Sequence, residues 1–152
     1  MSDLKARLHD DLTTAMKARD ELRTATLRMA LTAIKNEEVS GGEARELDDA
    51  AVLKVLAREG KKRREAAEAF ANAGRAELAE REVAEGRVLE EYLPAQLSDE
   101  ELTALVAAAV AEAGATSPQQ MGAVMKLVTP QVAGRAEGGR VAAAVKRALA
   151  GA

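Results

Sequence analysis

The sequence has no cysteine and no tryptophan, and its 152 residues include one histidine, one tyrosine and one phenylalanine. Without cysteine, disulfides, thiolate metal sites and cysteine nucleophiles are excluded. With His9 as the single histidine, any site that needs two histidines is excluded as well. Because aromatic side chains are so scarce, the core must consist of aliphatic residues and alanine, which favours closely packed helices over sheets.

Long apolar runs are also lacking. No segment approaches the roughly 20 consecutive apolar residues that cross a bilayer. Residues 1–17 contain acidic side chains and no unbroken apolar run, so they do not resemble a signal peptide. We therefore expect a soluble, cytoplasmic protein without membrane association.

The residues that are present predict helices throughout, because apolar positions recur with helical spacing and no stretch alternates with the period of a strand. Four longer helices are expected over about residues 2–18, 20–39, 48–73 and 75–92. Three shorter ones follow, over about 98–113, 117–128 and 140–149. The sequence thus predicts an all-α protein with an N-terminal bundle of about four helices (1–93), a three-helix C-terminal module (98–152) and a short linker (94–97).

The expected helix ends rest on local signals. Helices are expected to begin after side chains that can cap them, namely Asp20, Asp48 or Asp49, Ser98 and Ser117. Ser98 is followed three residues later by Glu101, which makes a capping box. Pro94 is expected to end the fourth helix, and Pro130 to bend or end the sixth near Val128.

The third and fourth predicted helices carry charged residues on faces that are otherwise apolar. Glu59 and Arg63 fall on the stripe of the third helix, and Glu82 and Glu85 interrupt that of the fourth. In an antiparallel hairpin that turns at Gly74, Arg63 lies about level with Glu85. We predict a structural ion pair of Arg63 with Glu85 or Glu82 inside the helix interface. No metal is expected, because a di-metal site in a helical bundle would need Glu-x-x-His pairs.

Motifs for catalysis are missing. The sequence contains no nucleophile motif, no glycine-rich phosphate loop and no cluster of catalytic acids, so we assign no catalytic residue and no cofactor. The segment GRAEGG at residues 134–139 is either a plain turn between helices or a turn whose backbone N–H groups bind phosphate beside Arg135 and Arg140.

The second predicted helix combines two apolar faces with a narrow polar stripe. One apolar face consists of Leu27, Leu31 and Ile34, and the other of Leu22, Ala25, Met29 and Ala33. The polar stripe between them consists of Thr24, Arg28, Thr32 and Lys35. A helix that is apolar on two sides is expected to lie among several neighbours. The polar stripe is either solvated or a contact for phosphate or for an acidic partner.

A local excess of positive charge lies near the C-terminus. The net charge of the chain is −3, but residues 118–152 carry five basic residues and one acidic residue, Glu137. The candidate RNA-binding cations are Lys126, Arg135, Arg140, Lys146 and Arg147, together with Arg28 and Lys35 of the second helix. Because aromatic side chains for base stacking are almost absent, structured RNA recognised by shape and backbone is the expected ligand. Ordinary surface charge is the alternative.

Several segments carry a family resemblance: TLRMALTAIKNEEV, VLEEYLPAQLS, and MGAVM followed by GRAEG. In order and spacing they resemble the GatB/YqeY family, with Glu137 standing where many relatives carry aspartate. The resemblance implies a small helical protein similar to the C-terminal tail of the B subunit of the tRNA-dependent amidotransferase. That enzyme amidates Glu-tRNA(Gln) or Asp-tRNA(Asn) with glutamine and ATP. Its tail is the part associated with tRNA, and activation takes place in a separate domain.

Through this resemblance we expect a non-catalytic accessory protein of translation that binds tRNA or acts in tRNA metabolism. Its expected partners are tRNA or another structured RNA, and a protein of tRNA aminoacylation or amidation. One alternative is a protein–protein adaptor for an aminoacyl-tRNA synthetase or amidotransferase. The other, which the resemblance alone offers, is a carbon–nitrogen ligase with glutamine as amido-N-donor.

The stretch that contains the only tyrosine joins the two predicted modules. Tyr92, Leu93, Pro94 and Leu97 are expected to form a joint, because Pro94 stops one helix and Ser98 starts the next. A ligand contact for Tyr92 is the alternative, since a tyrosine suits a half-wet interface.

Overall fold

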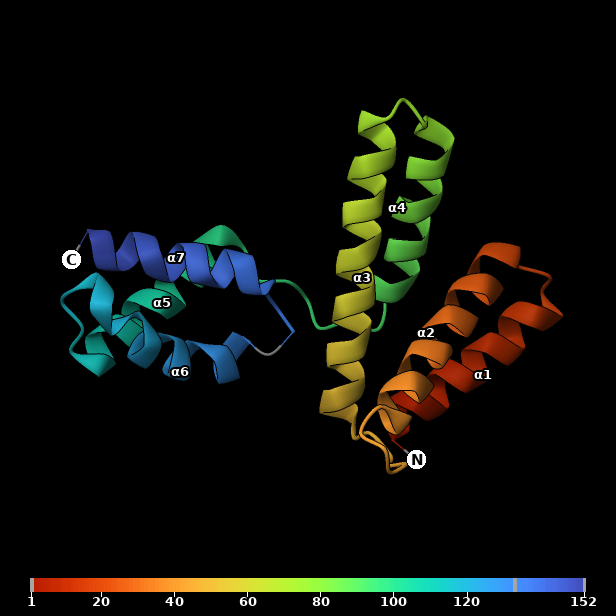
Figure 1. Cartoon of the computed structure of the whole chain (residues 1–152), viewed down its shortest axis with the longest axis horizontal. Coiled ribbons are helices and arrows are strands. Elements are labelled where there is room, and N and C mark those ends of the chain that lie inside the picture. The colour runs from red at the N-terminus through yellow and green to blue at the C-terminus, as the bar shows by residue number, and fades with distance from the viewer. Residues whose placement is uncertain (1, 133, 152) are drawn as a thin grey trace. The chain divides into compact units, whose positions relative to one another are not determined.

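The computed structural model describes residues 2–132 and 134–151, and these residues form helices and no strand (Figure 1). The all-α prediction is confirmed. The chain divides into two compact units, Met1–Leu93 and Pro94–Ala152. Unit 1 contains α1 (Asp3–Lys17), α2 (Glu21–Val39), α3 (Asp49–Asn72) and α4 (Ala76–Glu90). Unit 2 contains α5 (Asp99–Ala113), the short 3₁₀ helix η1 (Pro118–Gln120), α6 (Met121–Val132) and α7 (Gly138–Ala150).

Side-chain caps start the first three helices of unit 1. The side chains of Ser2, Asp20 and Asp48 accept hydrogen bonds from backbone N–H groups in the first turns of α1, α2 and α3. Each cap satisfies a donor that a helix start would otherwise leave without a partner. The starts predicted after Asp20 and Asp48 are therefore confirmed.

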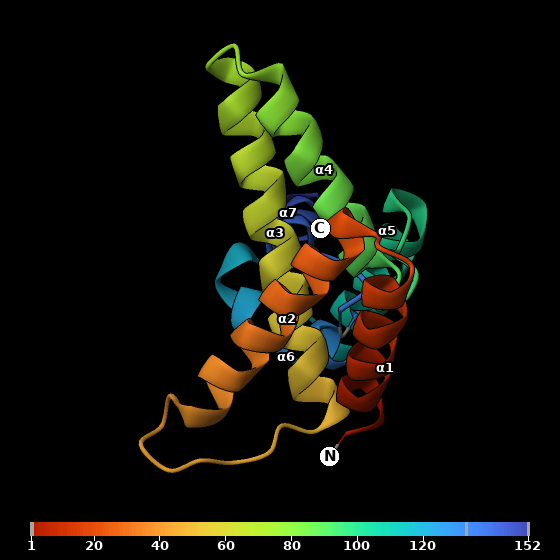
Figure 2. The same ribbon diagram turned by 90° about the vertical axis from the view of Figure 1, so that its right-hand side faces the viewer.

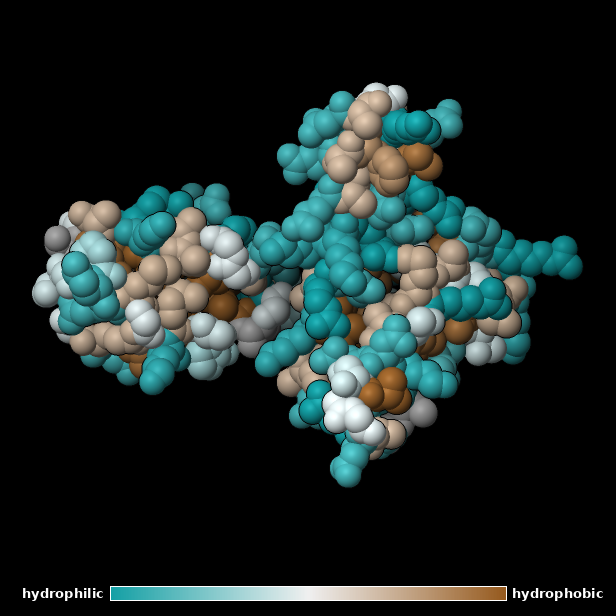
Figure 3. Space-filling view, in the orientation of Figure 1, coloured by the Kyte–Doolittle hydropathy of each residue, from teal (hydrophilic) through white to brown (hydrophobic). Residues whose placement is uncertain are grey.

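Unit 1 consists of two antiparallel helical hairpins, α1–α2 and α3–α4, joined by the loop of residues 40–48 (Figures 1 and 2). Its aliphatic core contains Leu8, Leu27, Ala30, Ile34, Leu47, Val52, Val55, Leu56, Val88, Leu89 and Tyr92. The free end of the α3–α4 hairpin shows apolar atoms among hydrophilic ones (Figure 3). On α4, Leu78 and Val83 are both more than two-fifths exposed.

The loop between the hairpins is held by a buried carboxylate at the end of α2. Glu38 accepts a hydrogen bond from Lys5 Nζ at 2.8 Å and another from the backbone N–H of Leu47 at 3.3 Å. The hydrogen bond from Lys5 lowers the pKa of Glu38, and that from Leu47 adds to the effect against the opposing influence of burial. Glu38 thereby ties α1, α2 and the loop together.

In unit 2, α5 starts with the predicted capping box. Glu101 N donates to Ser98 Oγ at 3.1 Å, and Ser98 N donates to Glu101 Oε1 at 3.1 Å. The predicted end of α6 near Val128 is wrong, because the helix continues to Val132 with Pro130 inside it. A proline in the last turn removes one helical N–H bond, and the helix stops two residues later.

The core of unit 2 is a second aliphatic cluster. It contains Leu97, Leu102, Val106, Ala109, Ala115, Val124, Val128, Val132, Val141, Ala144, Val145 and Leu149. This cluster draws on α5, α6 and α7, so that each helix of the unit buries one face against the other two.

Residues 94–97 belong to the compact unit 2. Leu97 is 5% exposed, and its N–H donates to the carbonyl of Arg135 at 2.7 Å. Tyr92 lies in the core of unit 1, with Leu93 packed against that core. A function of these residues as a joint stays a prediction.

Candidate functional site

The main depression in unit 1 is a groove of about 470 Å³ between α2 and α3. The residues that line it are Arg28, Met29, Thr32, Ala33, Asn36, Glu37, Ser40, Arg58, Glu59, Lys62 and Arg63. A second depression, of about 420 Å³, shares Arg28 with the first and extends along α2 toward its N-terminus. Its lining is Met16, Arg19, Glu21, Thr24, Ala25 and Arg28.

The second apolar face of α2 contributes apolar side chains to both depressions, and Met16 of α1 adds another to the second. Ala25, Met29 and Ala33 line them, and Met29 is 39% exposed. The first apolar face behaves differently, since Leu27 and Ile34 are completely buried in the core. As expected for a helix with two apolar faces, α2 lies among several neighbours, since it contacts α1, α3 and α4. On the second face, Leu22 and Ala33 pack against the core, and Met29 lies exposed in the groove.

The polar stripe of α2 lies along the same depressions. Thr24, Arg28 and Thr32 line them, while Lys35 is exposed and lies outside the two linings. From the sequence alone, this stripe was expected either to be solvated or to contact phosphate or an acidic partner. Its position beside an open apolar strip makes it one rim of a groove.

The opposite side of the groove is built on a buried ion pair. Arg63 Nε of α3 lies 3.5 Å from Glu85 Oε2 of α4, and both residues are 8% exposed. The predicted pairing of Arg63 with Glu85 is confirmed. Glu59 is also buried, and its Oε2 lies 3.8 Å from Arg63 Nη1. Removing one partner of such a buried pair is far more destabilising than replacing both.

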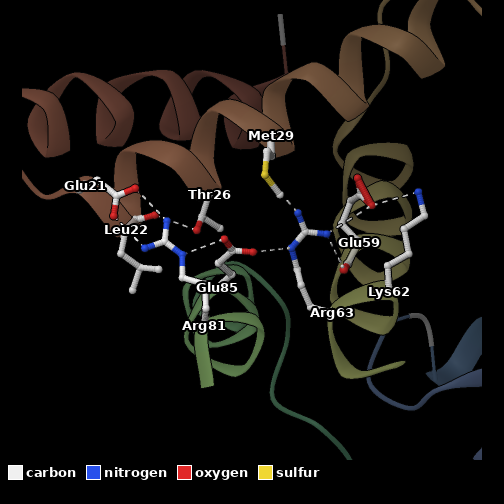
Figure 4. A network of polar contacts seen from close by, with 9 residues as sticks. All are labelled: Glu21, Leu22, Thr26, Met29, Glu59, Lys62, Arg63, Arg81 and Glu85. Atoms are coloured by element: carbon white, nitrogen blue, oxygen red, sulfur yellow. Dashed lines mark hydrogen bonds and ion pairs between the residues drawn. The ribbon is translucent and has the colours of Figure 1, made fainter. Parts of the chain in front are cut away.

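The buried pair is the centre of a longer network that joins three helices (Figure 4). Arg81 bridges Glu85 at 3.1 Å and Glu21 of α2 at 2.7 Å. At the other end, Lys62 Nζ lies 3.2 Å from Glu59. The order of the network, with charges alternating in sign, is Glu21, Arg81, Glu85, Arg63, Glu59 and Lys62.

Glu82, the alternative partner of Arg63, lies beside this network on α4. Burial raises the pKa of the Glu82 carboxyl, and the neighbouring Glu85 raises it further. The positive charges of Arg63 and Arg81 oppose this shift. Arg63 thus pairs with Glu85 and Glu59, and the effect of Glu82 on the network is a weaker, longer-range one.

Two of the candidate RNA-binding arginines hold unit 2 together. Arg140 Nη2 donates to the carbonyl of Leu97 and to Asp99 Oδ1, both at 2.9 Å. Arg135 Nε donates to the carbonyl of Ala95 at 3.3 Å. Both side chains are half-buried and fasten residues 95–99 to the unit, so they have structural partners already.

The remaining candidate cations are divided between the two units. Lys126 on α6 and Lys146 and Arg147 on α7 are exposed. Arg28 and Lys35 belong to α2 of unit 1, and Arg28 lies in the linings of the two depressions described above.

Across the described ranges 2–132 and 134–151, no three acidic or histidine side chains are grouped in a way that would hold a metal ion. In the same ranges, no helix has the length and apolar character needed to cross a membrane.

The fold defines a class: a small protein whose described residues form two compact all-helical units. Over residues 5–149 the chain matches the family described as Yqey-like protein, and it belongs to that family. The family resemblance recognised in the sequence is thus confirmed.

Curated relatives share about a third of their residues with this chain. "Altered inheritance of mitochondria protein 41, mitochondrial" of Lachancea thermotolerans is 35% identical over 91 residues, which is 60% of this chain and 48% of the relative. The protein of the same name from Eremothecium gossypii is 33% identical over 105 residues, covering 68% and 57%. That from Clavispora lusitaniae is 35% identical over 101 residues, covering 65% and 58%. The matches span about half the length of these relatives.

These relatives correct two expectations. A tRNA-binding or tRNA-metabolism accessory protein, or an adaptor for an aminoacyl-tRNA synthetase or amidotransferase, was expected, but the relatives are named for mitochondrial inheritance instead. A cytoplasmic location was also expected, and it is contradicted because the relatives are named as mitochondrial proteins. Neither the family description nor the names of these relatives supports a carbon–nitrogen ligase.

Proposed function

We propose that this chain is a non-catalytic protein-binding module, and that the groove between α2 and α3 receives a helix of a partner protein. The observation that carries the proposal is the apolar strip in the depressions along α2, where Met29 is 39% exposed between the half-buried Ala25 and Ala33. Exposed apolar side chains in a groove rimmed by polar ones are typical of sites that accept an amphipathic helix.

The wall and the floor of the groove are held in place by packing and ion pairs within unit 1. On the α3 side its wall is held by the Arg63–Glu85 ion pair, and on the α2 side its floor is backed by the core residues Leu27 and Ile34. A partner helix would therefore meet a preformed surface, which reduces the entropy lost on binding. Met29 supplies a flexible apolar contact of the kind that adapts to different partners.

Site-specific photocrosslinking tests this function. A photoreactive amino acid replaces Thr32, which is exposed and lines the groove. The matched control is Thr13 on α1, an exposed threonine outside both depressions whose hydroxyl, like that of Thr32, bonds the carbonyl four residues earlier. We expect a discrete protein adduct at position 32 and none at 13, formed in native cells and unaffected by nuclease.

The crosslinked segment is then mapped by mass spectrometry and synthesised. The peptide should become helical on binding the full chain and should block the crosslink at position 32 in a saturable way. An adduct to nucleic acid, equal labelling at positions 13 and 32, or a peptide that fails to compete would each contradict the proposal.

A further inference from the structure

The hydrogen bonds of the Arg63 guanidinium group go to weak acceptors, although the carboxylates of Glu85 and Glu59 lie 3.5 Å and 3.8 Å away. Nη1 donates to the backbone carbonyl of Glu59 at 3.3 Å, and Nη2 donates to the sulfur of Met29 at 3.5 Å. Nε lies near Glu85 but makes no hydrogen bond of good geometry. Since a guanidinium has five donors and a thioether is a weak acceptor, much of its hydrogen-bonding capacity is poorly used.

Arg28, on the rim of the same groove, is exposed, and its guanidinium also contacts a methionine sulfur. Its Nη2 donates to the sulfur of Met16 at 3.7 Å, and no carboxylate lies within ion-pair distance of it in the described part of the chain. Met16 is 48% exposed and Met29 39% exposed. Two arginines of the groove thus each face a methionine sulfur where a carboxylate would bind more strongly.

Building on the proposed function, we infer that the partner helix is acidic, and that its carboxylates displace the sulfur atoms of Met29 and Met16 from Arg63 and Arg28. Methionine suits such a displaceable cover, because its side chain is unbranched and turns about three bonds. Met29 projects from α2 toward Arg63 across the groove (Figure 4), so a rotation of its side chain uncovers Nη2. The displaced thioether remains as an apolar contact for the partner.

The charges of the groove favour an acidic protein helix over a nucleic acid. Glu37 and Glu59 line the groove together with the cations, and Glu21 lies in the adjoining depression. A continuous phosphate backbone would meet these carboxylates as well as the arginines. A helix can place two carboxylates next to Arg28 and Arg63 and set neutral or apolar side chains against the acids.

Selection from a display library of helical peptides, randomised on one face, tests the inference with the full chain as target. Peptides that also block the crosslink at position 32 should carry aspartate or glutamate at two positions beside apolar residues. If the selected peptides block the crosslink but lack acids, the inference is wrong and the protein-binding function stands. If no peptide blocks the crosslink, both are wrong.

Two variants then test the arginines and their covers, using the best acidic peptide and its glutamine-substituted counterpart. Arg28→Gln should lower the affinity of the acidic peptide by roughly tenfold, because one charge-assisted hydrogen bond is lost. Met29→Ala should raise the affinity of the acidic peptide a few-fold, because Arg63 is uncovered. The same change should lower the affinity of the neutral peptide, because an apolar contact is lost. Lys146→Gln, which changes an exposed cation of unit 2, should alter neither affinity.

The opposite effects of Met29→Ala on the affinities of the two peptides distinguish a side chain that covers Arg63 from an ordinary apolar contact. If Met29→Ala weakens both peptides alike, the methionine is a contact and the carboxylate does not reach Arg63. If Arg28→Gln leaves the preference for the acidic peptide unchanged, the rim arginine is not its receptor. Either result overturns the inference.

Discussion

Tyr92 is buried where α4 ends, and its hydroxyl donates to Asp11 of α1 at 2.5 Å while the guanidinium of Arg7 stacks over its ring. Burial raises the pKa of Tyr92 to about 12, and the hydrogen bond to Asp11 raises it in the same direction. The chain has no other tyrosine and no tryptophan, so tyrosinate absorbance reports on this residue alone. Tyr92 is thus a spectroscopic probe of how α1 packs against the residues that follow α4.

We predict that tyrosinate absorbance in the native protein titrates with a midpoint of about 12, against about 10 in the urea-denatured chain. The folded state retains the proton over this interval and the unfolded state loses it. Stability should therefore fall as the pH rises from about 10 to about 12. A native midpoint near that of the denatured chain would show that the hydroxyl is solvated and does not bond Asp11.

The paired carboxylate of Glu38 leads to a prediction for the stability of the protein at acidic pH. Because Lys5 lowers the pKa of Glu38 in the folded state, its stabilising effect is present above the unfolded pKa of about 4.3 and is lost as the pH falls through the folded value. We expect Glu38→Gln to lower the free energy of unfolding by about 1 kcal/mol at neutral pH. Urea unfolding at a series of pH values should show this difference shrinking below about pH 4.

The control for Glu38 is Glu37, its neighbour on α2, which pairs with the exposed side chain of Arg58 at 3.2 Å. Glu37→Gln should have little effect, because exposed ion pairs contribute a fraction of a kcal/mol. A stability difference for Glu38→Gln that stays constant down to strongly acidic pH would mean that the carboxylate charge is not what holds the loop.

At the scale of elements, the α3–α4 interface depends on the order of charges in its network. Glu85→Leu leaves the buried guanidinium of Arg63 with Glu59 as its remaining carboxylate, so we expect a loss of about 3 kcal/mol. Arg63→Met should cost less, about 1 kcal/mol, because Glu85 keeps Arg81 and Glu59 keeps Lys62. The double variant should regain most of the loss from Glu85→Leu.

A double-mutant cycle by urea denaturation measures this asymmetry. The prediction requires a coupling between the two positions of more than about 1 kcal/mol, with Glu85→Leu the worse of the single changes. Additive effects, or a more damaging Arg63→Met, would show that the pair does not act as the centre of the network.

Local features of these elements could be predicted from the sequence. The starts at Asp20, Asp48 and Ser98 depend on side chains within one turn of the helix. The Arg63–Glu85 pair could be predicted because an antiparallel hairpin that turns at Gly74 determines which residues face each other. The end of α6 could not, because the energetic effect of Pro130 depends on how near it lies to the last turn.

The groove lies beyond such local reasoning. Periodicity places Ala25, Met29 and Ala33 on one face of α2, but it does not say whether another helix covers that face. This depends on the angle at which the α1–α2 and α3–α4 hairpins diverge, which is set by the packing of the whole of unit 1 (Figure 1). The polar stripe could therefore be predicted from the sequence, whereas the exposure of Met29 to solvent could not.

At the scale of the whole molecule, a correct prediction of the family did not bring a correct prediction of the function. The resemblance to an amidotransferase tail predicted the family correctly and the function wrongly, because a helical scaffold does not by itself determine what it binds. The details of the charges agree with this result. Arg135 and Arg140, which gave the C-terminal segment its basic character, bond to the chain's own residues 95–99.

The same bonds predict where unit 2 begins. A fragment of residues 94–152 retains Leu97, whose side chain is buried and whose N–H donates to the carbonyl of Arg135. A fragment of residues 98–152 loses both, and it leaves Arg140 without the carbonyl of Leu97. A buried leucine contributes about 2 kcal/mol and a hydrogen bond about 1 kcal/mol, so we expect the shorter fragment to be about 3 kcal/mol less stable.

Urea unfolding followed by circular dichroism compares the two fragments, with Leu97→Ala in the longer one separating the side chain from the backbone bond. In the full chain, Leu97→Ala should speed hydrogen exchange in α5 and α7, since both pack in the cluster that contains Leu97. Domains this small have little stability to spare, so the loss should be large enough to unfold much of the shorter fragment. Equal stabilities, with exchange in the full chain unchanged, would mean that residues 94–97 are a linker after all and that the compact unit starts at Ser98.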